Sequence, residues 1–123
     1  MKRQETTDNK QDRVTPTLSV EFRTQNYDLT PAVREQLEAD TQKLAPLLRD
    51  FPVVFLHADI HEHPHQHDFH LKLSLRLPND TLFTGERHVQ MRSAYLQCVR
   101  QMATKVKDYK AKLAKRADYA ETR

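Results

Sequence analysis

The sequence has little glycine, little cysteine and no long apolar run. Gly85 is the only glycine among 123 residues, which excludes the glycine-rich loops that cradle nucleotide phosphates. Cys98 is the only cysteine, so no disulfide can form within the chain, and its place in an apolar pattern indicates a buried, inert thiol. No segment has the apolar length of a signal peptide or a membrane span. We therefore expect a cytoplasmic protein with no membrane partner.

The length of the chain and the distribution of its apolar residues predict one domain. We expect residues 1–16 to form a flexible polar tail and residues 17–116 to form a single domain around one core. Residues 117–123 are expected to be a C-terminal tail.

The first part of this domain is typical of a strand followed by a helix. Residues 17–25 alternate apolar and polar side chains, as a half-buried strand does. Thr30 and Pro31 indicate a helix start, because the hydroxyl can cap the helix and proline suits its first position. Helical spacing of apolar residues continues to Leu48, and Pro46 is expected to end or kink the helix near its last turn.

Residues 52–63 and 67–77 predict a β-hairpin, and residues 81–87 a further antiparallel strand. Pairing Ile60 with Leu71 keeps the apolar rows of both hairpin strands on one side. The opposite side then carries polar groups of the two strands, namely His57, Lys72, Ser74 and Arg76.

Residues 90–116 show the clearest pattern of the chain. Seven apolar side chains recur every three or four positions along one face of a long helix: Met91, Tyr95, Cys98, Met102, Val106, Tyr109 and Leu113. All elements together predict an α+β fold of order βαβββα, with two helices packed on one face of a four-stranded sheet and the other face open.

The last helix is strongly basic on the side away from its apolar face. Residues 100–116 hold seven basic residues and one acid, a net charge of +6, whereas the whole chain carries +3. With 3.6 residues per turn, Arg100 and Lys107 point directly away from the apolar face, flanked by Arg92 and Lys110. Such a surface favours a polyanionic partner. The alternative is a solvated face that is basic only for solubility.

Histidines gather around the expected hairpin tip, at His57, His61, His63, His65, His67 and His70. Alternation makes His61, His63, His65 and His67 a candidate zinc, nickel or copper site. Pro64 interrupts the strand and no cysteine assists, so we favour the absence of a metal. Two alternatives stay open: a polar turn without a role, and imidazoles that gain charge as the pH falls and strengthen contact with RNA.

No group of residues predicts catalysis. Asp59, Glu62 and Asp68 lie near the histidines, but no nucleophile, cofactor motif or sign of a deep pocket accompanies them. We expect no enzyme activity, no cofactor and no small-molecule substrate.

Four motifs together resemble the ribosome hibernation promoting factor and ribosome-associated inhibitor family, the sigma-54 modulation proteins. They are Leu-Thr-Pro-Ala-Val-Arg at 29–34, Lys-Leu at 43–44, Leu-x-Leu-x-Leu-Pro-x-x-x-Leu at 73–82 and Tyr-Lys-x-Lys-Leu at 109–113. The match runs from Leu18 to Leu113, and the order and spacing of the motifs make it specific.

The resemblance implies the βαβββα fold, which is similar to that of double-stranded RNA-binding domains. It implies a ribosome-associated translation inhibitor or hibernation factor that binds the decoding channel of the small ribosomal subunit and silences idle ribosomes during stress and stationary phase. Ribosomal RNA would be held chiefly by charge and shape. Arg34, Lys43, Lys110 and Lys112 match basic positions of the family. With the charge pattern added, the expected ribosome-binding residues are Arg34, Lys43, Arg92, Arg100, Lys105, Lys107, Lys110 and Lys112.

The sequence departs from the family pattern in the last helix. The usual Asp-Met-Tyr-x-Ala-Ile is here Gln-Met-Arg-Ser-Ala-Tyr at 90–95, and the usual Lys-Leu-x-Arg-Gln-Leu is Gln-Met-Ala-Thr-Lys-Val at 101–106. Ribosome contacts are therefore expected to be weaker or rearranged. The chain resembles the short form of the family, which does not pair ribosomes unaided. The alternative function is a non-ribosomal RNA-binding module or a His-rich metal-binding regulator derived from this family.

Overall fold

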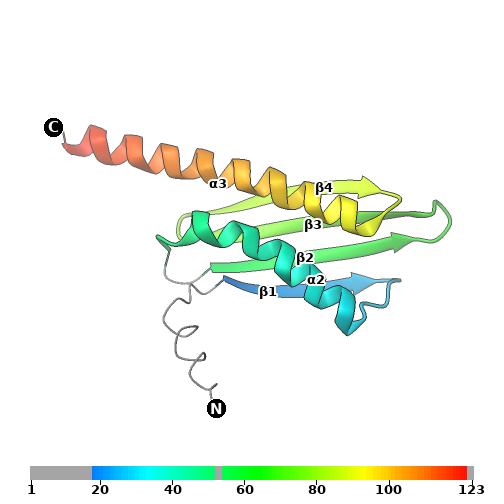
Figure 1. Ribbon diagram of the computed structural model, residues 1–123. Helices are drawn as coiled ribbons and strands as arrows, with labels where there is room; N and C mark the ends of the chain where they lie inside the picture. The colour runs from blue at the N-terminus through cyan, green and yellow to red at the C-terminus, as the bar shows by residue number, and fades with distance from the viewer. Residues whose placement is uncertain (1–17, 52–53, 122–123) are drawn as a thin grey trace, which may run out of the picture.

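The computed structural model describes residues 18–51 and 54–121, which form a four-stranded sheet with helices on one face (Figure 1). The elements are β1 (Leu18–Gln25), α2 (Pro31–Thr41), the 3-10 helix η2 (Gln42–Leu48), β2 (Val54–His63), β3 (Asp68–Leu77), β4 (Asp80–His88) and α3 (Met91–Glu121). The expected α+β fold of order βαβββα is confirmed. Residues 1–17 and 52–53 lie outside the described residues, and so does the tail expected over residues 1–16.

The strands lie in the order β1-β2-β3-β4. β1 runs parallel to β2, whereas β2 with β3 and β3 with β4 are antiparallel. Because parallel neighbours need a crossover connection, α2 and η2 carry the chain across one face of the sheet between β1 and β2. Ile60 pairs with Leu71 and His61 with His70, so the expected hairpin register is confirmed.

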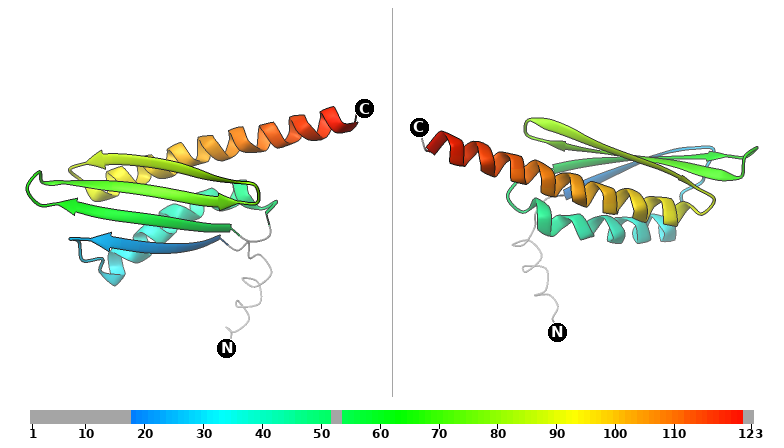
Figure 2. Two further views of the ribbon diagram at one scale, coloured as in Figure 1. Left: turned by 180° about the vertical axis from the view of Figure 1, so that it is seen from behind. Right: turned by 90° about the horizontal axis from the view of Figure 1, so that it is seen from above.

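The core lies between the sheet and the helices, which lie side by side on one face (Figure 2). Leu56, Ala58 and Ile60 of β2 and every second residue of β3 from Leu71 to Leu77 are buried. The apolar face of α3 packs against them: Met91, Tyr95, Cys98, Met102 and Val106 are buried, with Tyr109 and Leu113 partly buried. This confirms the expected apolar pattern of the helix.

The first helix begins where expected but changes geometry early. The Thr30 hydroxyl accepts a hydrogen bond of 3.3 Å from the Val33 amide, and Pro31 occupies the first turn. α2 ends at Thr41, and the 3-10 helix η2 follows with Pro46 inside it. Pro46 has no N–H to donate four residues back, to Gln42, and it disfavours α geometry in the residue before it. The tighter 3-10 winding still buries Leu44 and Leu48.

The last helix extends beyond the sheet (Figure 1). α3 continues past Arg116 to Glu121, so the stretch expected to be a C-terminal tail is helical as far as Glu121. Neither glycine nor proline occurs after Arg116 to stop the helix, and alanines there favour it. No helix in the described part of the chain combines the length and apolarity needed to cross a membrane.

Candidate nucleic-acid interface

The outward side of α3 carries a row of exposed cations. We define the α3 ridge as Arg100, Lys107 and Lys115, because helical geometry places these three nearly opposite the buried apolar face. The rise per residue puts Lys107 about 10 Å from Arg100 along the axis and Lys115 about 12 Å further. None of the three forms an ion pair with any described residue. Their charges are therefore available to a partner.

On the flank of α3 that faces α2 and η2, the cations bind acceptor groups of the same chain. The Lys110 ammonium donates a hydrogen bond of 3.0 Å to the carbonyl of Leu47 and lies 3.3 Å from a carboxylate oxygen of Asp50. Arg92 binds Asp40 of α2. These two residues were expected in the ribosome-binding set, but the structure shows that each also joins α3 to the neighbouring helical segment.

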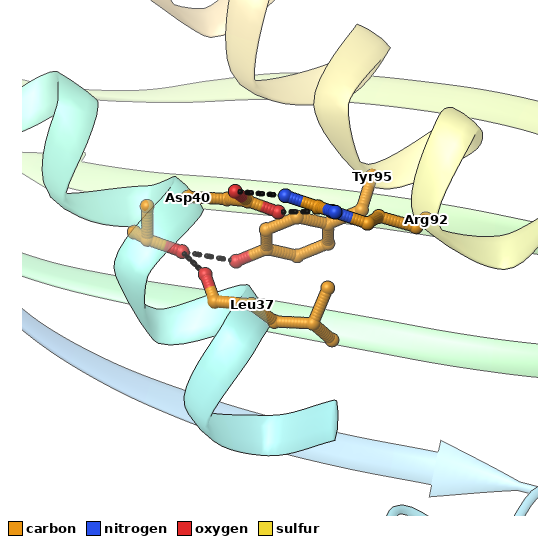
Figure 3. Close-up of polar contacts among 5 residues, drawn as sticks. Leu37, Asp40, Arg92 and Tyr95 are labelled. Atoms are coloured by element: carbon orange, nitrogen blue, oxygen red, sulfur yellow. Dashed lines mark hydrogen bonds and ion pairs between the residues drawn. The ribbon is translucent and has the colours of Figure 1, made fainter. Parts of the chain in front are cut away.

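A polar junction lies beneath this flank (Figure 3). Arg92 donates from Nε and Nη2 to the two carboxylate oxygens of Asp40, at 3.1 Å each. This pairing raises the pKa of the Arg92 guanidinium. The Asp40 residue is only 4% exposed, so the ion pair supplies its charge partner.

Thr41 and Tyr95 complete the junction. The Thr41 hydroxyl donates to the Leu37 carbonyl at 2.7 Å, so its oxygen accepts from the Tyr95 hydroxyl (Figure 3). Burial raises the pKa of Tyr95 to about 12. The tyrosine thus stays neutral and serves as a hydrogen-bond donor at neutral pH.

The other flank of α3 reaches the edge of the sheet. The Lys105 ammonium donates a hydrogen bond of 2.7 Å to the carbonyl of Phe83 in β4. Lys112 is exposed on the same flank, and with Lys105 it lines a shallow hollow that also contains Asp80 and Asp108. This flank therefore brings two lysines to the edge strand, together with two carboxylates.

The two basic residues expected on the first helical segment lie apart from α3. Arg34 pairs with Glu38 one turn along α2, with Nε 3.4 Å from the carboxylate, and its guanidinium carbon lies 5.4 Å from the Phe22 ring centroid. Lys43 is exposed on η2. The carboxylate of Glu38 offsets part of the charge of Arg34, so the largest unpaired group of cations is on α3.

The histidines at the hairpin tip are divided between the sheet and the turn. His61 and His63 have ring centroids 4.0 Å apart, and His70 lies 6.2 Å from His63. His65 and His67 are exposed in the turn. The structure does not bring the four candidate ligands together. Within residues 18–51 and 54–121 no group of three His, Cys, Asp or Glu is placed to hold a metal ion.

His70 faces positive neighbours. Burial lowers its pKa, and Lys72, Arg87, His63 and His61 lower it further. It therefore gains charge only at a lower pH than an ordinary imidazole.

Sequence reasoning missed two exposed aromatic side chains. Phe55 and Phe83 lie on the open face of the sheet, opposite the helices. The alternation of side chains along the strands could have revealed them, because Phe55 and Phe83 point to the same side of the sheet as Ser74 and Arg76. The sequence prediction placed only polar groups on that side.

Comparison with known proteins identifies the family. The family model described as "Sigma 54 modulation protein / S30EA ribosomal protein" matches residues 20–114. The chain belongs to this family. The resemblance found in the sequence is thereby confirmed, and the description of the family names an S30EA ribosomal protein.

Two solved structures share the fold of this S30EA family member. A ribosomal subunit interface protein from Coxiella burnetii matches with a TM-score of 0.66 at 21% identity, over 76% of this chain and 98% of that one. The N-terminal domain of Protein Y from Thermus thermophilus matches with a TM-score of 0.59 at 17% identity, over 75% and 94%. At such identities the likeness shows the fold alone. No match was found among the curated proteins.

One departure from the S30EA pattern now has a structural reason. Arg92 replaces a residue that is usually tyrosine, and its guanidinium binds Asp40. The side chain at this position therefore links α2 to α3 in this chain.

Proposed function

We propose that this protein binds the small ribosomal subunit in its decoding channel and inhibits translation by idle ribosomes in the cytoplasm. The observation that carries the proposal is the α3 ridge: three exposed cations without an acidic partner among the described residues, on a chain of the S30EA family. Lys105 and Lys112 extend the proposed contact along the flank of α3, and Arg34 on α2 and Lys43 on η2 add to it from the other helical segment.

Electrostatics gives the ridge its proposed role. Ribosomal RNA presents a dense row of phosphates, and cations that neutralise them release counterions, so affinity falls as salt rises. Recognition by charge and shape needs no base-specific contact. A rigid helix with cations spaced along its axis can recognise RNA by charge and shape in this way.

The first experiment measures ribosome binding directly. Purified protein is sedimented with ribosomes through a sucrose cushion over a range of salt concentrations. The parent is expected to sediment with small subunits and whole ribosomes at low salt and to be released as salt rises. The variant R100Q/K107Q/K115Q should be released at lower salt, with the slope of log K against log salt reduced by about 0.7 for each phosphate that is no longer neutralised.

A charge-conserving variant is the matched control. R100K/K107R/K115R keeps every positive charge and should sediment like the parent. Both variants should remain folded, because exposed substitutions shift stability by no more than about 0.5 kcal/mol. If the glutamine variant sediments and inhibits cell-free translation like the parent, the ridge is a solvated surface and the proposal fails.

Competition tests the location on the ribosome. Small subunits loaded with messenger RNA and transfer RNA should bind less protein than empty subunits, because the proposed site is the channel that those RNAs fill. Equal binding to loaded and empty subunits would contradict a decoding-channel site while leaving ribosome association intact.

A further inference from the structure

Figure 2 shows the face of the sheet opposite the helices, which none of the described helices covers. This face carries two exposed aromatic rings. Phe55 on β2 is 49% exposed and Phe83 on β4 is 62% exposed. Across the central strand β3, Phe55 is paired with Arg76 and Phe83 with Ser74. Isolated exposed apolar side chains are common on protein surfaces. The groups that surround the rings therefore decide what this face can bind.

Polar groups separate the two rings. They sit two strands apart and two residues out of register, so strand geometry places their backbones about 12 Å from each other. Arg76 and Ser74 of β3 lie between them. The rings therefore do not form the continuous apolar patch that a protein partner would cover.

Three cations on this face lack acidic partners among the described residues, whereas Arg87 pairs with Asp68. Arg23, Lys72 and Arg76 form no ion pair with any described residue. Arg23 and Lys72 line a hollow of about 380 Å³ together with His61, His70 and Asp59. Asp59 pairs in register with Arg23 on one side and Lys72 on the other. The hollow thus offers cations to a phosphate and a carboxylate acceptor to a hydroxyl group.

The face is continuous with the charged surface of α3. Lys105 donates from the helix to the carbonyl of Phe83 at 2.7 Å, which brings a cation to the edge of the sheet beside that ring. A nucleic acid in contact with α3 therefore meets Lys105 on the way around β4 to the open face, where Asp80 and Asp108 share the flank with it.

We propose that the open face of the sheet binds a single-stranded RNA segment. Bases stack on Phe55 and Phe83, and phosphates contact Arg76 and the cations of the hollow. Aromatic rings beside a basic surface are the general means by which proteins hold single strands, because every base has a face to stack. The Asp59 carboxylate can accept from a ribose 2′-hydroxyl, which favours RNA over DNA. This site is additional to the ribosome binding proposed for α3 and does not depend on it.

The experiment uses a fluorescent, uridine-rich RNA oligonucleotide of about 10 nucleotides and measures its binding to the full chain by anisotropy. Replacing each ring should weaken binding about 10-fold, so F55A/F83A should bind far more weakly than the parent. F55Y/F83Y keeps both rings and should bind like the parent. V89A removes an exposed apolar side chain outside the sheet face and serves as the matched control.

Leucine variants separate stacking from simple apolar contact. F55L/F83L should lose RNA binding as the alanine variant does, because leucine has no ring. RNA binding by F55L/F83L equal to that of the parent would overturn the proposal. So would a parent that self-associates through this face in sedimentation velocity and binds no oligonucleotide. Equal affinity for DNA of the same sequence would overturn the assignment to RNA.

Ribosome binding by α3 and RNA binding by the open face of the sheet can be tested independently of each other. R100Q/K107Q/K115Q should lose ribosome binding while keeping most of its affinity for the oligonucleotide. F55A/F83A should lose affinity for the oligonucleotide while keeping ribosome binding through α3. Circular dichroism checks that every variant is folded.

Discussion

The guanidinium of Arg92 and the carboxylate of Asp40 face each other with two parallel hydrogen bonds of 3.1 Å. They join the first turn of α3 to the last turn of α2. Planar, two-point pairing fixes relative orientation as well as distance. The pair therefore sets how the two helices lie against each other on the sheet.

We expect R92Q to lower the thermal unfolding midpoint more than R100Q does. R92Q leaves the buried Asp40 carboxylate without its cation, whereas Arg100 lies on the exposed α3 ridge. Thermal unfolding followed by circular dichroism measures both. Adding D40N to R92Q should recover part of the loss, because the buried group is then neutral. Equal midpoints for R92Q and R100Q would contradict a structural role for the pair.

We expect Y95F to lower the free energy of unfolding by about 1 kcal/mol, because it removes the hydrogen bond between the buried Tyr95 and Thr41 hydroxyls. Urea denaturation measures the change. A double-mutant cycle with T41V should show that the two substitutions are coupled. Strictly additive effects would mean that this hydrogen bond contributes nothing to stability.

Stability should fall on mild acidification because of His70. Its folded-state pKa is lowered from 6.5 by burial and by Lys72, Arg87, His63 and His61. The unfolded state then binds more protons than the folded state just below pH 6.5, so stability is lost as the pH falls through that value. The unfolding midpoint of the parent should drop more than that of H70Q between neutral pH and mildly acidic pH.

Two acids near His70 limit the effect, and one of them, Asp59, lines the same hollow as His70. Asp68 lies 3.5 Å from Arg87 and offsets part of the positive charge. R87Q removes a cation that disfavours protonated His70 and should reduce the loss of stability on acidification. A parent that unfolds at the same temperature across this range would refute the prediction for His70.

Native Cys98 should react slowly with a thiol reagent. Burial raises its pKa to about 11, so the thiolate that reacts is scarce near pH 8 and is also shielded. Labelling should accelerate strongly in urea, where the thiol is exposed and its pKa returns to an ordinary value. Rapid labelling of folded protein would contradict the packing of α3.

The sequence was sufficient to predict elements that depend on local periodicity. The alternation of the hairpin determines the pairing of Ile60 with Leu71, because a shift by one residue would turn every apolar side chain outward. The apolar stripe of α3 follows from the same kind of pattern. Both patterns depend only on residues that are close together in the sequence.

Features that depend on distant residues could not be predicted in this way. Asp40 and Arg92 are 52 positions apart, and no local motif marks them as partners. The α-helix gives way to the 3-10 helix η2 several residues before Pro46. In η2, Leu44 and Leu48 are buried against the rest of the core, and local sequence does not reveal the change of geometry that places them there. The division of the histidines depends on the turn between β2 and β3, which His67 completes with a positive φ of 55° just before β3 begins.

The parallel pairing of β1 with β2 also has a consequence for folding. β2, β3, β4 and α3 are joined by short turns, whereas β1 reaches its partner only after α2 and η2 have crossed the sheet. Closing that longer loop costs more chain entropy and adds the least local of the strand pairings. We therefore expect the amides of β1, an edge strand, to exchange with solvent faster than those of β2 and β3. The strand that comes first in the described sequence would then be the last to join the sheet and the first to leave it.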